Sequence, residues 1–70
     1  MTLEELQKIF SDATSDTWHQ HPNGGGWVQN TAKVAKLAYI GKDAVVYGDA
    51  EVRWNSSILG NARVFGVKNK

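Results

Sequence analysis

The chain has 70 residues, a formal net charge of +1 and no cysteine. This length accommodates one small domain, and the lack of cysteine excludes disulfide bonds and thiolate metal sites. No segment approaches the ~20 apolar residues of a membrane span, so we expect a cytoplasmic protein without a membrane partner.

The charges are divided unevenly along the sequence. Residues 1–29 carry one lysine against four acidic residues, a net charge of −3, whereas residues 30–70 carry seven Lys or Arg against three acidic residues, a net charge of +4. The acidic part either lies on the basic part or leaves it facing an anionic partner. An excess of this size is typical of a solvated surface and does not favour nucleic-acid binding.

The N-terminal segment predicts an amphipathic helix over residues 2–13. Its apolar residues recur at steps of three or four: Leu3, Leu6, Phe10 and Ala13. Thr2 and Glu5 have the spacing of a capping box. Because so short a helix is marginal alone in water, its apolar stripe must be covered. It either packs on the protein's own core or meets another copy.

A connection is expected over residues 14–26, where one proline and three consecutive glycines break any helix. It contains the only histidines, His19 and His21. Two ligands are too few for a zinc site unless Asp16 or a neighbouring subunit adds more. We therefore interpret both as ordinary loop histidines, and we expect neither a bound metal nor a cofactor.

From residue 27 to residue 66 the sequence repeats with a period of six. An aliphatic residue returns at every sixth position: Val34, Ile40, Val46, Val52, Ile58 and Val64. A small residue stands two positions before each: Ala32, Ala38, Ala44, Ala50, Ser56 and Ala62. Side chains two apart on a strand point to the same side, so these two residues of each hexad face one interior. The repeat therefore predicts short strands stacked in parallel.

This pattern resembles the hexapeptide-repeat family of left-handed parallel β-helices, over residues 24–66. In that family three hexads make one triangular coil, so the resemblance implies that residues eighteen apart stack, as in the column Val28, Val46 and Val64. The implied fold class is mainly β. It is a short left-handed parallel β-helix of about two coils, preceded by one helix and followed by a tail at 67–70, in a single domain.

One outer face of the expected coils is unusually apolar. Its apolar side chains are Trp27, Val45, Tyr47 and Phe65. Because so few coils bury little surface, we expect either the N-terminal helix or another copy to cover this face. We predict a homo-oligomer, with a dimer favoured, whose contacts include these residues. Trp54, expected at a corner, is a separate candidate contact.

The segments GGGWV, AVVYGDAEV and GNARVFG also resemble small bacterial and prophage proteins with G-N-A-R-V-type repeats. That resemblance implies a phage-derived, non-enzymatic inhibitor or adaptor that acts on a larger protein. The alternative is a minimal enzyme of the hexapeptide family, acyltransferase-like or zinc carbonic-anhydrase-like, with a site between subunits. No catalytic residue carries over, because both histidines lie outside the repeats.

Overall fold

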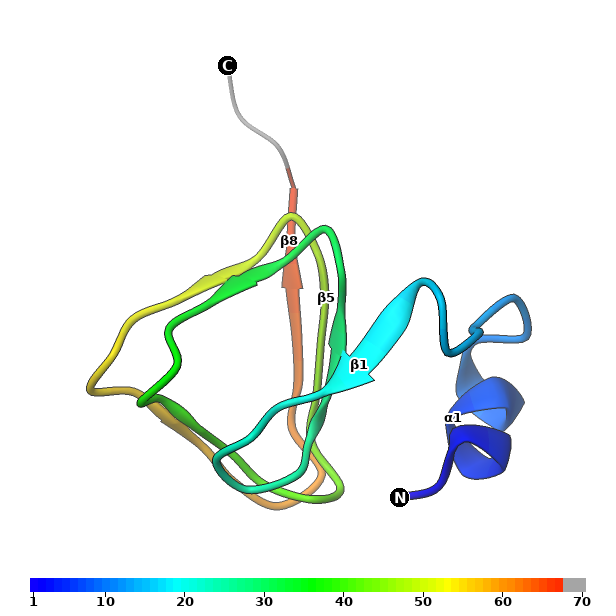
Figure 1. Cartoon of the computed structure of the whole chain (residues 1–70), viewed down its shortest axis with the longest axis horizontal. Helices are drawn as coiled ribbons and strands as arrows, with labels where there is room; N and C mark the ends of the chain where they lie inside the picture. Colours follow the sequence, from blue (N-terminus) through cyan, green and yellow to red (C-terminus); the bar gives the residue numbers. More distant parts are fainter. Residues whose placement is uncertain (68–70) are drawn as a thin grey trace.

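The structure, a computed structural model, describes residues 1–67 of the chain. These residues are mainly β, with one short helix (Figure 1). In chain order the elements are α1 (Leu3–Ile9), β1 (Trp18–Gln20), β2 (Trp27–Gln29), β3 (Lys33–Val34), β4 (Tyr39–Ile40), β5 (Val45–Gly48), β6 (Glu51–Val52), β7 (Ser57–Ile58) and β8 (Arg63–Gly66). Of the tail expected at 67–70, only Val67 lies within the described residues.

Strands that are eighteen residues apart pair in parallel and form three small sheets. The sheets have the orders β1-β2-β5-β8, β3-β6 and β4-β7. Val46 pairs with both Val28 and Val64, and Val34 pairs with Val52. The expected register is therefore confirmed. Figure 1 shows that the sheets form the sides of a triangle. We call this arrangement the stack, with β2, β3 and β4 at its N-terminal end and β8, β6 and β7 at its C-terminal end.

The interior of the triangle is filled by the two inward-facing residues of each hexad. The buried residues of this inner core are Val28, Ala32, Ala38, Ile40, Ala44, Val46, Ala50 and Val52. Val46 and Val52 are both buried, as the repeat predicts. At one corner Gly48 has a φ of 70°, and a Cβ there would lie 2.5 Å from the Gly66 carbonyl oxygen. Only glycine suits both that backbone conformation and that close approach.

Helix α1 is shorter than the expected 2–13 and spans Leu3–Ile9. Its capping box is formed: the Glu5 N–H donates to Thr2 Oγ1 at 3.2 Å, and the Thr2 N–H donates to Glu5 Oε1 at 2.8 Å. The backbone bond from Thr2 to the carboxylate is the main cause that lowers the pKa of Glu5. The helix ends because Phe10 is extended, and the Ser, Asp and Thr residues that follow favour turns.

The helix packs on the outer face of the sheet that contains β2, β5 and β8. A second buried cluster lies between them: Leu6, Ala13, Trp18, Trp27 and Val45. The Trp27 Nε1–H also donates to the Met1 carbonyl at 2.7 Å. Figure 1 shows the helix beside the triangle, so it does not close either end of the stack. Of the two alternatives for the helix, packing within its own chain is the one observed.

Strand β1 lies inside residues 14–26, where the sequence predicts a connection. It runs antiparallel to β2, with Trp18 opposite Gln29 and Gln20 opposite Trp27. Trp18 is buried against the helix, whereas His19 and Gln20 are exposed. The prediction of a loop here is wrong, because one buried aromatic side chain and pairing with an existing edge are enough to order a strand of three residues.

Candidate functional site

The N-terminal end of the stack is covered, at two of its three sheets, by β1 and the segment that follows it. The Ile40 N–H donates to the Asn23 carbonyl at 3.0 Å, and the Ile40 carbonyl accepts from the Gly26 N–H at 2.9 Å. His21 is buried, and its Nε2 lies 2.7 Å from the Ala38 carbonyl oxygen. Since a carbonyl oxygen only accepts, Nε2 carries the proton. Residues 18–26 thus cover the strand edges of two of the three sheets at this end.

At the C-terminal end of the stack, none of residues 1–67 provides such a cover. In β6 the Val52 carbonyl accepts from the Ala35 N–H of the preceding layer at 2.9 Å. Alternate residues of a strand direct their backbone groups to opposite edges, so those of Glu51 face away from the preceding layer. Within residues 1–67, no strand pairs with β6, β7 or β8 on that side. This end therefore presents three strand edges.

Part of the inner core is exposed at the same end, on the sides formed by β7 and β8. Ala44 is fully buried, but Ala62, eighteen residues later in the same column, is exposed. Ile40 and Val46 are fully buried, whereas their stacked equivalents Ile58 and Val64 are only partly buried. The residue types match within each of these columns, so the difference comes from the position in the stack. The third column is an exception, because Val52 in β6 is buried at 7% exposure and Val34 in β3 is only partly buried.

A row of aromatic side chains leads along the outside of the stack to this open end. Trp18 contacts Phe10 with ring centroids 5.0 Å apart, Phe10 contacts Tyr47 at 4.8 Å, and Tyr47 contacts Phe65 at 4.9 Å. Burial falls along the row, from 3% exposure at Trp18 to 56% at Phe65. A hollow beside Phe65 is lined by Thr31, Lys33, Glu51, Val64 and Val67, among others. The open strand edges and Phe65 together form the candidate site.

The expected interface residues have different environments in the structure. Trp27 and Val45 are buried beneath α1 and are not available to a partner, which corrects their assignment as contacts. Tyr47 is partly buried against Phe10. Phe65 remains on the surface. The sequence could not distinguish these positions, because an alternating pattern shows which side chains point outward but not which of them a helix covers.

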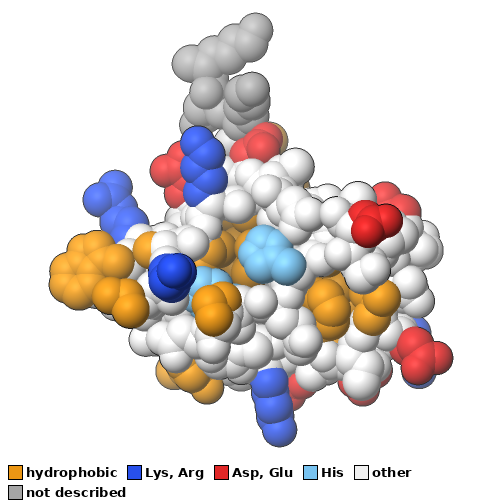
Figure 2. All heavy atoms as spheres, viewed as in Figure 1, with side chains coloured by type: hydrophobic (Ala, Val, Ile, Leu, Met, Phe, Trp, Pro, Cys, Tyr) orange, Lys and Arg blue, Asp and Glu red, His pale blue; other side chains and the backbone are white. Residues whose placement is uncertain are grey.

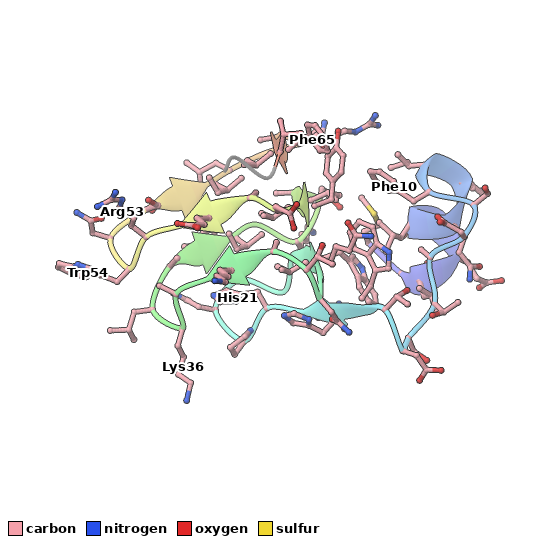
Figure 3. The ribbon with its side chains drawn as sticks, turned by 90° about the horizontal axis from the view of Figure 1, so that it is seen from above. Phe10, His21, Lys36, Arg53, Trp54 and Phe65 are labelled. Atoms are coloured by element: carbon pink, nitrogen blue, oxygen red, sulfur yellow. The ribbon has the colours of Figure 1, made fainter. Side chains whose placement is uncertain are left out.

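Trp54 lies at the corner between β6 and β7 and is 67% exposed. Figure 3 places it at the end of the molecule opposite Phe10, next to Arg53 and with Lys36 nearby. Figure 2 shows hydrophobic side chains that project at this side of the molecule beside Lys or Arg side chains. The corner is therefore a second exposed apolar feature, separate from the row that ends at Phe65.

The two histidines make structural contacts. His19 Nδ1 lies 2.7 Å from Asn30 Oδ1, and the Asn30 amide donates to the Asp16 carbonyl at 2.8 Å. His21 is not an ordinary loop histidine. Its ring is buried and is hydrogen-bonded to the carbonyl of Ala38, the residue that precedes β4. In the described part of the chain, no three His, Cys, Asp or Glu side chains are grouped so that they could hold a metal ion.

Comparison of the chain with protein-family models, with curated proteins and with solved structures found no match. Among residues 1–67, no helix has the length and apolar character needed to cross a lipid bilayer. The surfaces that the described residues expose are therefore the features that indicate a function.

Proposed function

We propose that this chain is a small non-enzymatic binding protein, an inhibitor or adaptor, that acts through protein–protein contacts as a homo-oligomer, most simply a dimer. We further propose that its stack is a short left-handed parallel β-helix. The resemblance of its hexads to that family supports this fold, as does the eighteen-residue register in all three sheets. A crystal structure with right-handed coils would contradict it.

The observation that carries the proposal is the open C-terminal end of the stack. Ala62 is exposed there, and Ile58 and Val64 are only partly buried, although each belongs to an inner column. Burial of apolar surface stabilises an association by roughly 25 cal/mol per Å² before the costs of binding. Unpaired strand edges favour pairing with another chain. A contact at this end therefore gains both apolar burial and backbone hydrogen bonds.

Phe65 extends this surface onto the outside of the stack. It is supported on one side by Tyr47, which in turn rests on Phe10, so its ring is held in place before any partner binds. Rigid aromatic side chains at the centre of a contact tend to carry much of its free energy. A dimer with two-fold symmetry uses the same patch on both copies and closes without further growth.

The non-enzymatic part of the proposal is supported by the positions of the histidines. His21 Nε2 is committed to the Ala38 carbonyl, and His19 Nδ1 is bonded to Asn30. Each ring thus has a structural role that engages one of its two nitrogens. Elemental analysis of the purified protein tests this part, and a stoichiometric metal that is lost in His19→Ala would overturn it.

The oligomer is tested by sedimentation equilibrium of the wild type, Phe65→Ser and Leu37→Ser. We expect the wild type to sediment at twice the 7.7 kDa mass of the chain, and Phe65→Ser to shift toward the monomer. Leu37 is an exposed apolar residue in the first layer of the stack, between β3 and β4, so Leu37→Ser is the matched control and should leave the mass unchanged. A wild type that stays at 7.7 kDa at all concentrations would contradict the oligomer.

A further inference from the structure

Two corners of the stack lie one above the other, on the side of the molecule opposite the helix, and both expose apolar side chains. One corner joins β3 to β4 and contains Leu37, which is 72% exposed. The other joins β6 to β7 and contains Trp54. The parallel register, with Tyr39 opposite Ser57, stacks one corner on the other. An exposed tryptophan with an exposed leucine on the neighbouring layer is a larger apolar patch than single surface residues normally provide.

This patch carries only positive charge. Residues 35–38 and 53–56, which form the two corners, contain Lys36 and Arg53 and no acidic residue. Within residues 1–67, the ion pair found joins the amino group of Met1 to Asp43, so neither Lys36 nor Arg53 forms an ion pair. Figure 3 shows that both cations lie at the same end of the molecule as Trp54.

We infer that the basic corner, defined as Lys36, Leu37, Arg53 and Trp54, binds an acidic protein segment that carries an apolar side chain. This inference rests on the proposed function, since it names the chemistry of the target that such a binding protein engages. Trp and Arg are enriched among residues that dominate binding energy, and an Arg fork recognises a carboxylate through two hydrogen bonds. Leu37 and Trp54 supply the apolar contact, and the two cations orient the acidic chain.

Two other occupants fit the corner less well. Nucleic acid binds through many phosphate contacts, but the corner offers two cations, with Glu51 close by on β6. The acidic helix α1 of a second copy has suitable charge, but it lies at the opposite end of its own chain (Figure 3). A contact between opposite ends is head-to-tail and continues into a filament unless it closes into a ring.

The protein contains its own optical probe for this site. Its other two tryptophans, Trp18 and Trp27, are buried at 3% and 8% exposure, so quenching by acrylamide reports mainly on Trp54. The test titrates the full chain with a synthetic peptide in which glutamates flank one phenylalanine. The reference peptide has glutamine in place of every glutamate. We expect saturable protection of Trp54 from acrylamide by the acidic peptide, and binding about tenfold weaker for the glutamine peptide.

Variants assign the effect to the corner. Lys36→Glu combined with Arg53→Glu should abolish the protection, whereas Lys8→Glu combined with Lys42→Glu, which also removes two exposed cations, should retain it. Trp54→Ala should weaken binding of the acidic peptide by about tenfold or more, as measured by calorimetry, because this variant lacks the optical probe. The unfolding midpoint of each variant in urea is measured alongside, so that a folding defect is recognised.

Four outcomes would overturn the inference. They are no saturable binding of the acidic peptide by the folded wild type, equal binding of the glutamine peptide, tighter binding of an oligothymidylate of equal charge, and a native mass that falls in Lys36→Glu/Arg53→Glu. The proposed oligomer fails separately. If Phe65→Ser and the wild type are both monomers but still bind the peptide, the basic corner stands and the oligomer does not.

Discussion

Ile40 and Ile58 occupy the same column of the stack, one layer apart, but their surroundings differ. Both backbone groups of Ile40 are bonded to the segment between β1 and β2, and its side chain is fully buried. Ile58 is only partly buried, because no described residue forms the layer beyond it. The repeat therefore defines which residues face inward, but an additional, non-repeating segment is required to close an end.

The largest effect is expected for a charge placed in the inner core, which both ends of the stack adjoin. Val52 is buried in the inner core, and Val52→Asp places an unpaired carboxylate there. We expect the free energy of unfolding to fall by more than ~3 kcal/mol, which is most of the stability of a domain of this size. Far-UV circular dichroism and the melting temperature measure it. A variant with an unchanged spectrum and melting temperature would contradict the described core.

A matched pair of truncations tests the difference between the ends directly. Val46 and Val64 pair in one column, but Val46 is fully buried and Val64 is not. We expect Val46→Ala to lower the free energy of unfolding by about 2 kcal/mol and Val64→Ala by less than about 1 kcal/mol. Urea titrations at low protein concentration give both values. Equal losses at that concentration would show that the C-terminal end is covered.

The histidines provide a smaller contrast within the segment that closes the N-terminal end. His21→Ala removes the side-chain partner of the Ala38 carbonyl in a buried site. We expect it to lower the free energy of unfolding by about 1–3 kcal/mol. His19→Ala affects an exposed side chain and should cost less than about 0.5 kcal/mol. Thermal unfolding of the two variants measures this. If the costs are equal, the ring of His21 does not close that end.

The smallest effect concerns Glu5 at the start of α1. Its pKa is lowered in the folded state, chiefly by the hydrogen bond from the Thr2 N–H. The ionised carboxylate therefore stabilises the helix above the ordinary glutamate pKa, and this contribution is lost as the pH falls through the lowered value. The difference in melting temperature between wild type and Glu5→Gln should shrink over that acidic range. A difference that is independent of pH would contradict the capping role.

The period of six predicts much of this structure because it is a local property of the sequence. It gave the inner columns, the pairing of strands eighteen residues apart and the burial of Val52. Strand β1 and the end of α1 were not predicted, because both depend on tertiary contacts. Trp18 contacts Phe10, and after the helix ends the chain turns through a segment in which Thr14, Asp16 and Thr17 bond to one another.

The surface was predicted only in part. The alternating pattern identified Trp27, Val45, Tyr47 and Phe65 as one outward stripe, and they do share one sheet. Which of them the helix covers depends on where the chain returns after residue 9, and that is not encoded in the pattern. The structural role of His21 was missed because its partner, the Ala38 carbonyl, is a backbone group and leaves no trace in the residue types.

The eighteen-residue register has a consequence for how such a chain can change in length. An inserted duplicate of one complete set of three hexads would occupy one more layer, about 4.8 Å thick, and return the chain to the same corner in the same direction. Each column would gain one member, while the closed N-terminal end and the exposed last layer would keep their neighbours. Lengthening of the gene in steps of 54 nucleotides, three for each of eighteen codons, would therefore change the height of the protein without altering its cross-section.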